Sequence, residues 1–90
     1  MYNVLIVDDH EEVRAVVRAT LEEGPYEFFE AAIGADGIDQ ARIVRPDLVV
    51  LDITMPGGID GYDVCSAIKK HPATRAARVL MLTARGQQVD

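Results

Sequence analysis

Acidic side chains directly follow two of the apolar segments in this sequence. Residues 4–7 precede Asp8 and Asp9, and residues 48–51 precede Asp52. Carboxylates that lie close together repel one another, and a hard cation with oxygen ligands is the usual compensation. A carboxylate beside Mg²⁺ can attack phosphorus, because the metal neutralises and orients the transferring group. If the fold brings these three residues together, they predict phosphoryl transfer to an aspartate.

Two further side chains belong to this chemistry. Thr83 follows the apolar residues 79–82, where its hydroxyl can hydrogen-bond a phosphoryl oxygen, and the small Ala84 next to it leaves room for that group. His10 is the one imidazole beside the acidic residues. The set is otherwise made of oxygen ligands, which argues against zinc or copper and favours Mg²⁺.

Alternating apolar segments and helical patterns predict the elements that position these residues. Strands are expected at residues 4–7, 26–31, 48–52 and 77–83, and helices are expected after Asp9, at residues 34–44 and at residues 60–70. Such alternation predicts an α/β fold, with a parallel sheet and right-handed crossover helices on both faces. In such sheets the ligand crevice lies at the carboxyl ends of the strands. The acidic residues and Thr83 are all expected at that edge.

The helices carry more detailed expectations. Asp9 and Glu12 have the spacing of a capping box, which would make Asp9 a helix N-cap as well as a ligand. The apolar face of the first helix is predicted at Val13, Val16, Val17, Thr20 and Leu21, and that of the second at Ala35, Ile38 and Ala41. Asp60 is predicted to cap the third helix, and Arg14 is predicted to be a surface residue that pairs with an acid.

Composition narrows the class of protein. The 90 residues are 49% hydrophobic, carry a formal net charge of −6 and include one cysteine, Cys65. This length fits one small domain, and the negative charge argues against direct contact with nucleic acid. No apolar run approaches the roughly 20 residues of a membrane span, and no signal peptide is apparent. We therefore expect a soluble cytoplasmic protein without membrane contact.

The ordered set of motifs resembles the receiver domain of bacterial two-component response regulators. The matching pieces are residues 4–9, Arg14, residues 46–56, Asp60-Gly61 and residues 79–84. Each piece alone is weak, but the set covers essentially the whole chain. The resemblance implies a flavodoxin-like doubly wound parallel sheet with strand order 2-1-3-4.

The resemblance also implies roles for individual residues. Asp52 would be the phosphoacceptor, and Thr83 would be the switch hydroxyl that moves toward the phosphoryl group. Asp9 would bind Mg²⁺ directly, Asp8 mainly through water, and the backbone carbonyl of Thr54 would be a further ligand beside Asp52. The donor would be the phosphohistidine of a sensor histidine kinase or a phosphotransfer protein.

The sequence departs from the family in two places. The loop at residues 55–61 is one residue longer than the commonest form. The chain also ends before the usual fourth helix, fifth strand and fifth helix, and so lacks the family's phosphate-contacting lysine. Residues 1–90 are therefore expected to form an incomplete receiver domain. Its fourth strand would be an exposed edge, which predicts a homodimer or a strand-paired assembly.

Three functions remain open at this point. The leading one is a phosphoacceptor module. We do not expect it to be an enzyme, because it would only gain and slowly lose its own phosphoryl group. An aspartyl-phosphate phosphohydrolase would usually carry a second acid two residues after the nucleophile, where this sequence has Thr54. A receiver remnant that acts only by protein–protein binding is the main alternative. The sequence specifies neither the cognate kinase nor the output.

Overall fold

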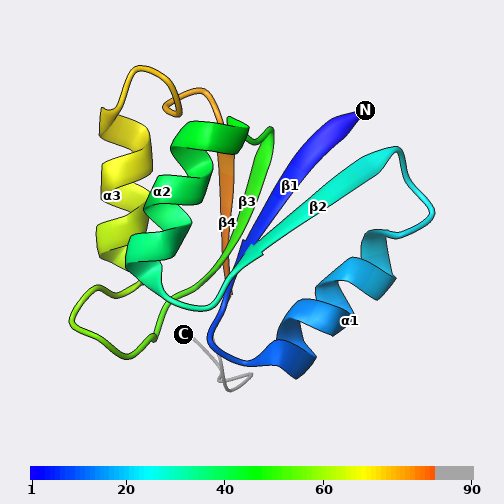
Figure 1. Cartoon of the computed structure of the whole chain (residues 1–90), viewed down its shortest axis with the longest axis horizontal. Coiled ribbons are helices and arrows are strands. Elements are labelled where there is room, and N and C mark those ends of the chain that lie inside the picture. The colour runs from blue at the N-terminus through cyan, green and yellow to red at the C-terminus, as the bar shows by residue number, and fades with distance from the viewer. Residues whose placement is uncertain (83–90) are drawn as a thin grey trace, which may run out of the picture.

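Strands and helices alternate through the 82 residues that the computed structural model describes, residues 1–82. The strands form one parallel sheet in the order β2-β1-β3-β4, which confirms the predicted fold class and strand order. One face of the sheet is covered by α1, and the other is covered by α2 and α3 (Figure 1). The elements are β1 (Tyr2–Val7), α1 (Glu11–Leu21), β2 (Tyr26–Ala31), α2 (Gly34–Val44), β3 (Leu48–Asp52), α3 (Gly61–Lys70) and β4 (Arg78–Leu82).

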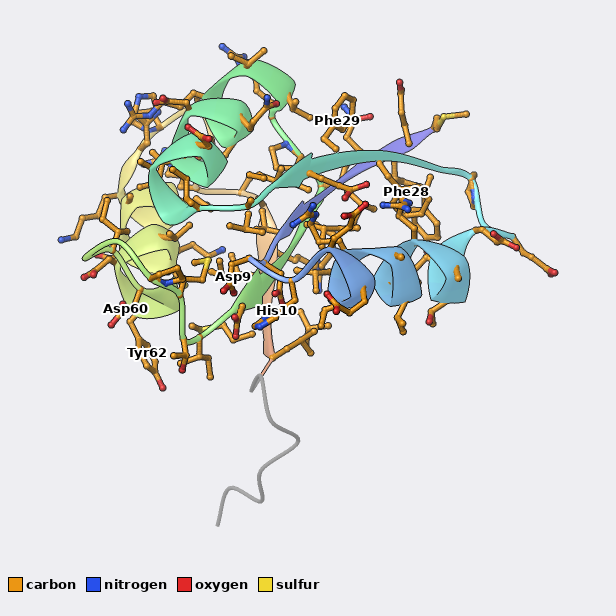
Figure 2. The ribbon with its side chains drawn as sticks, turned by 60° about the horizontal axis from the view of Figure 1, so that its bottom comes forward. Asp9, His10, Phe28, Phe29, Asp60 and Tyr62 are labelled. Atoms are coloured by element: carbon orange, nitrogen blue, oxygen red, sulfur yellow. The ribbon has the colours of Figure 1, made fainter. Side chains whose placement is uncertain are left out.

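The two central strands are apolar at Val4–Val7 of β1 and at Leu48–Leu51 of β3, because both faces of the sheet are covered there. Alternate residues of β1 and β3 point into two separate cores. Phe28 and Phe29 of β2 show the same alternation, with Phe28 on the side of α1 and Phe29 on the opposite side (Figure 2). The core under α2 and α3 is built around Leu5, Val7, Val49, Leu51, Val64 and Ile68, and the core under α1 around Val4, Ile6 and Val50.

The first helix is less buried than its apolar stripe predicts. Val17 and Leu21 pack against the core of Val4, Ile6 and Val50, but Val16 is 63% exposed. No residue of α1 is fully buried. The helix lies beside the β1 and β2 side of the sheet (Figure 1), so only part of its apolar face meets described residues.

The predicted capping box of α1 is wrong. His10 is the N-cap, and no side chain caps this helix. A capping box occurs instead at α3, where the Asp63 N–H donates to Asp60 Oδ1 over 2.9 Å and the Asp60 N–H donates to Asp63 Oδ2 over 3.1 Å. Because α1 begins only at Glu11, the Asp9 carboxylate does not reach the helix N–H groups.

The predicted apolar face of α2 is confirmed at Ile38 and Ala41 but is wrong at Ala35. Ala41 is buried and Ile38 packs against the core, whereas Ala35 is exposed and the two glycines Gly34 and Gly37 are buried. A Cβ at Gly37 would lie 2.9 Å from the methyl groups of Val7, so the helix approaches β1 too closely for a larger residue. Glycine therefore replaces the larger apolar residues of an ordinary helix stripe at this contact.

The sheet leaves β4 partly uncovered. Among the described residues β4 pairs with β3 alone, and Leu80 is 51% exposed.

No helix within residues 1–82 has both the length and the apolar character that crossing a bilayer requires.

Candidate functional site

The acidic residues meet at the carboxyl ends of β1 and β3. These strands are parallel neighbours, with Val7 opposite Leu51, so the residues that follow them are brought side by side. Asp8, Asp9, His10 and Asp52 each offer a ligand atom, and these atoms lie within 4.8 Å of one another. Figure 2 shows Asp9 and His10 together at this end of the sheet. The convergence expected from the sequence is therefore present.

Asp8 is held rigidly at the start of the turn. Its side chain is 5% exposed, and its Oδ1 atom accepts the His10 N–H over 2.8 Å and lies 3.2 Å from His10 Nδ1. Its own N–H donates to the Ala31 carbonyl over 3.0 Å. The hydrogen bond to Asp8 raises the pKa of the His10 imidazole, and the neighbouring Asp9 and Glu12 carboxylates add to this effect.

Two carboxylate oxygens in the cluster have no hydrogen-bond partner. Within residues 1–82, Asp9 Oδ1 and Asp52 Oδ2 are the buried side-chain atoms that make no hydrogen bond. Asp9 Oδ1 does lie 3.3 Å from His10 Nδ1, with which it forms an ion pair when His10 is protonated. Leaving a buried acceptor unpaired costs about 1–3 kcal/mol, and more when the group is charged. A divalent cation that coordinates both oxygens would compensate this cost. The donor set of carboxylate oxygens fits Mg²⁺, which prefers such ligands.

Burial raises the pKa of the Asp52 carboxyl, which is 1% exposed. The nearby Asp8 and Asp9 carboxylates raise it further. The Thr54 N–H, which donates to Asp52 Oδ1 over 3.2 Å, and His10 act in the opposite direction. Asp52 is thus a carboxylate whose ionised form depends on compensating positive charge.

Not every predicted site residue is placed by the structure. Thr54 is exposed and contacts Asp52 through its backbone N–H, so a ligand role for its carbonyl oxygen stays a prediction. Thr83 lies outside the described residues, and its switch role stays a prediction as well. Tyr62 of α3 is 62% exposed and projects outward (Figure 2).

Gly61 is a site residue whose role the sequence did not reveal. Its N–H donates to the Ile53 carbonyl over 2.8 Å, and a Cβ at this position would lie 2.3 Å from the Asp52 carbonyl oxygen. The N-terminus of α3 therefore packs directly on the backbone of the candidate acceptor. The sequence predicted Asp60 as a helix cap, but Gly61 was distinguished only by the family resemblance.

A hollow of about 590 Å³ lies at the other end of the strands. It is lined by the first residues of all four strands, among them Tyr2, Tyr26, Leu48 and Arg78. None of the four cluster residues lines it. The hollow thus lies at the amino ends of the strands, and the acidic cluster lies at their carboxyl ends.

Comparison with known proteins identifies the family. The family model of the response regulator receiver domain matches residues 4–90. The chain belongs to this family. It is 36% identical over 90 residues to the transcriptional regulatory protein AfsQ1 of Streptomyces coelicolor, with 100% of this chain and 38% of AfsQ1 covered. It is 34% identical to protein PilH of Pseudomonas aeruginosa, with 100% of this chain and 74% of PilH covered.

Solved structures agree with this assignment. The N-terminal domain of a response regulator receiver protein from Methanoculleus marisnigri superimposes on this receiver domain with a TM-score of 0.85 and 39% identity, covering 98% of this chain and 71% of that one. Chemotaxis protein CheY4 of Vibrio cholerae gives a TM-score of 0.85 and 31% identity, covering 97% and 72%. This receiver domain spans only 38% of the length of AfsQ1.

Proposed function

We propose that this receiver domain accepts a phosphoryl group on Asp52 from the phosphohistidine of a sensor histidine kinase or a phosphotransfer protein, with Mg²⁺ bound beside it. The observation that carries the proposal is a cluster of three carboxylates in which one buried oxygen of Asp9 and one of Asp52 make no hydrogen bond. Family membership supports the same role, because receiver domains are the phosphoacceptors of two-component signalling. A cytoplasmic location is part of the proposal.

The proposed ligands are the carboxylates of Asp9 and Asp52, the Thr54 carbonyl and, through water, Asp8. When bound, Mg²⁺ supplies charge neutralisation for the phosphoryl group and the carboxylates. The ionised Asp52 attacks phosphorus through a carboxylate oxygen. As the O–P bond forms, the P–N bond breaks and its electron pair returns to the imidazole of the donor. The Thr54 N–H, which donates to Asp52 Oδ1, restricts the orientation of the nucleophile.

The proposed module is a phosphoacceptor and not an enzyme. Turnover as a phosphohydrolase would require a group that activates water or protonates a leaving group. The position two residues after Asp52 carries Thr54, which has no carboxylate for that role. The domain is therefore proposed to carry the phosphoryl group as a signal.

Incubation with acetyl phosphate and Mg²⁺ tests this function through intact-mass analysis. Wild type and the control variant Asp39→Asn, which changes an exposed acid on α2, are expected to gain one phosphoryl group. Asp52→Asn, and wild type with a chelator, are expected to gain none. An equal adduct on Asp52→Asn would refute the assignment of the acceptor. A folded wild type that forms no adduct would favour the alternative, a receiver remnant that acts only by protein–protein binding.

Self-association of the 90-residue polypeptide is proposed separately. Leu80 is 51% exposed on β4, whose outer edge is unpaired within residues 1–82, and such apolar edges pair with other chains. Sedimentation at micromolar concentration is expected to show dimers or larger species. Leu80→Lys is expected to shift the distribution toward monomer, because a charged edge disfavours pairing. A monomeric wild type would disprove this proposal.

A further inference from the structure

Arg14 of α1 contacts the backbone of the acidic turn. Its side chain is only 15% exposed, although the sequence suggested a surface position. Its Nη1 atom donates to the backbone carbonyl of Asp8 over 2.7 Å, and its Nε atom donates to Glu30 Oε1 over 2.7 Å. The predicted pairing of Arg14 with an acid is thus present. Arg14 in addition binds the backbone of Asp8, a residue of the candidate metal site.

Glu30 holds this guanidinium in place from β2. The hydrogen bond from Arg14 lowers the pKa of the Glu30 carboxyl, so Glu30 is ionised at neutral pH. Arg18, one turn further along α1, contacts the second oxygen of the same carboxylate. Ala31, the residue after Glu30, accepts the Asp8 N–H. Both the N–H and the carbonyl of Asp8 are therefore held by groups outside its own turn.

We propose that Arg14, oriented by Glu30, is a positioning residue that sets the Mg²⁺ affinity of the acidic cluster. The inference rests on the proposed function, because it concerns the same metal site. The direction of the Asp8 side chain follows from its backbone, and Asp9 is the next residue in the chain. A hydrogen bond that fixes the Asp8 carbonyl therefore restricts both carboxylates. Groups that orient metal ligands from outside typically contribute about 10–100-fold to metal affinity.

Simple electrostatics predicts the opposite sign. Arg14 carries a positive charge near a site for a divalent cation, so its loss alone would make Mg²⁺ bind more tightly. If Arg14 acts by positioning Asp8, its loss makes Mg²⁺ bind more weakly. The direction of the change in affinity distinguishes the two effects.

Calorimetric titration of the metal-free domain with Mg²⁺ provides the test. Arg14→Gln is expected to raise the dissociation constant about 10-fold. The matched control is Arg18→Gln, which removes the same charge from the same helix and also contacts Glu30, but does not contact Asp8. It is expected to stay within about twofold of wild type, as a surface charge does. Unchanged or tighter binding by Arg14→Gln, or equal weakening in both variants, would overturn the proposal.

Arg14→Lys tests the same idea if Arg14→Gln does not fold. It keeps the charge, but its single amine lacks the rigid fork that reaches Asp8 and Glu30 together. Weaker Mg²⁺ binding at unchanged charge is the expected result, and wild-type affinity would contradict the inference.

Phosphoryl incorporation separates this inference from the proposed function. Arg14→Gln is expected to reach the wild-type extent of incorporation at saturating Mg²⁺, with the half-saturating concentration raised by the same factor as the dissociation constant. If wild type binds no Mg²⁺, the proposed function fails. If wild type and Arg14→Gln bind Mg²⁺ equally, the positioning role alone fails.

Discussion

The Asp52→Asn variant is expected to unfold at a higher temperature than wild type when divalent cations are removed. Asp52 is a buried carboxylate beside two others, and its Oδ2 atom has no hydrogen-bond partner. Asparagine removes one of the three neighbouring negative charges, so the repulsion among the carboxylates falls. We expect a gain of about 1–3 kcal/mol in the free energy of unfolding. Each kcal/mol corresponds to about 4–8 °C in a domain of this size.

The pH dependence of this gain has a defined sign. The pKa of Asp52 in the folded state is raised above its ordinary value of 3.8. Between these two pKa values the folded protein therefore binds more protons than the unfolded chain does. The contribution of the Asp52 carboxyl to the free energy of unfolding therefore falls as the pH rises from the unfolded-state pKa through the folded-state pKa. The gain in Asp52→Asn is expected to be small below the unfolded-state pKa and complete above the folded-state pKa. Thermal unfolding in a chelator across this range measures it, and a gain independent of pH would contradict the explanation.

Added Mg²⁺ is expected to reverse the order of stability. A ligand that binds only the folded state stabilises it, and the gain grows with the logarithm of the ratio of ligand concentration to dissociation constant. Wild type and the Asp39→Asn control retain all three carboxylates and should gain melting temperature on titration with Mg²⁺, whereas Asp52→Asn should gain much less. Equal stabilisation of all three proteins would show that the cation binds elsewhere.

Gly61→Ala is expected to destabilise the domain by about 3 kcal/mol, at the upper end of the usual cost of overpacking. The added Cβ would lie 2.3 Å from the Asp52 carbonyl oxygen and 2.7 Å from Ile53 Cα, and neither backbone atom can move away as a side chain would. Helix propensity alone predicts the opposite sign, because alanine favours helix over glycine by about 1 kcal/mol. Denaturant unfolding distinguishes the two effects.

Gly57→Ala is the matched control for this substitution. A Cβ at Gly57 meets nothing within 4 Å, but the residue has a φ of 95°, so only backbone strain is introduced. We expect a cost of about 1–2 kcal/mol. Gly61→Ala should also shift the Asp52 backbone and slow phosphoryl incorporation, whereas Gly57→Ala should change incorporation less. A neutral or stabilising effect of Gly61→Ala would disprove the close contact.

Elements and their order were predictable from the sequence because they depend on local periodicity. Residues 26–31 and 34–44 were predicted with the bounds that β2 and α2 have in the structure. The meeting of Asp8, Asp9 and Asp52 was predictable for a related reason. In a parallel sheet all carboxyl ends lie at one edge, so a residue that ends a strand is placed by topology alone.

Contacts between side chains of distant elements were not predictable in this way. Gly37 is buried and Ala35 is exposed because α2 lies very close to Val7, which hydrophobicity does not encode. Arg14 reads as a surface residue by type, yet it is largely buried between Glu30 and the Asp8 backbone. These positions depend on pairs separated along the chain, and a single periodic pattern carries no information about them.

Mapping the phosphorylated residue shows whether Asp52 is the phosphoacceptor. After reaction with acetyl phosphate and Mg²⁺, borohydride reduction converts an aspartyl phosphate to homoserine, which peptide mass spectrometry assigns to a position. We expect homoserine at position 52 and unmodified aspartate at positions 8 and 9. Modification of Asp8 or Asp9 with Asp52 unmodified would contradict the assignment of the acceptor.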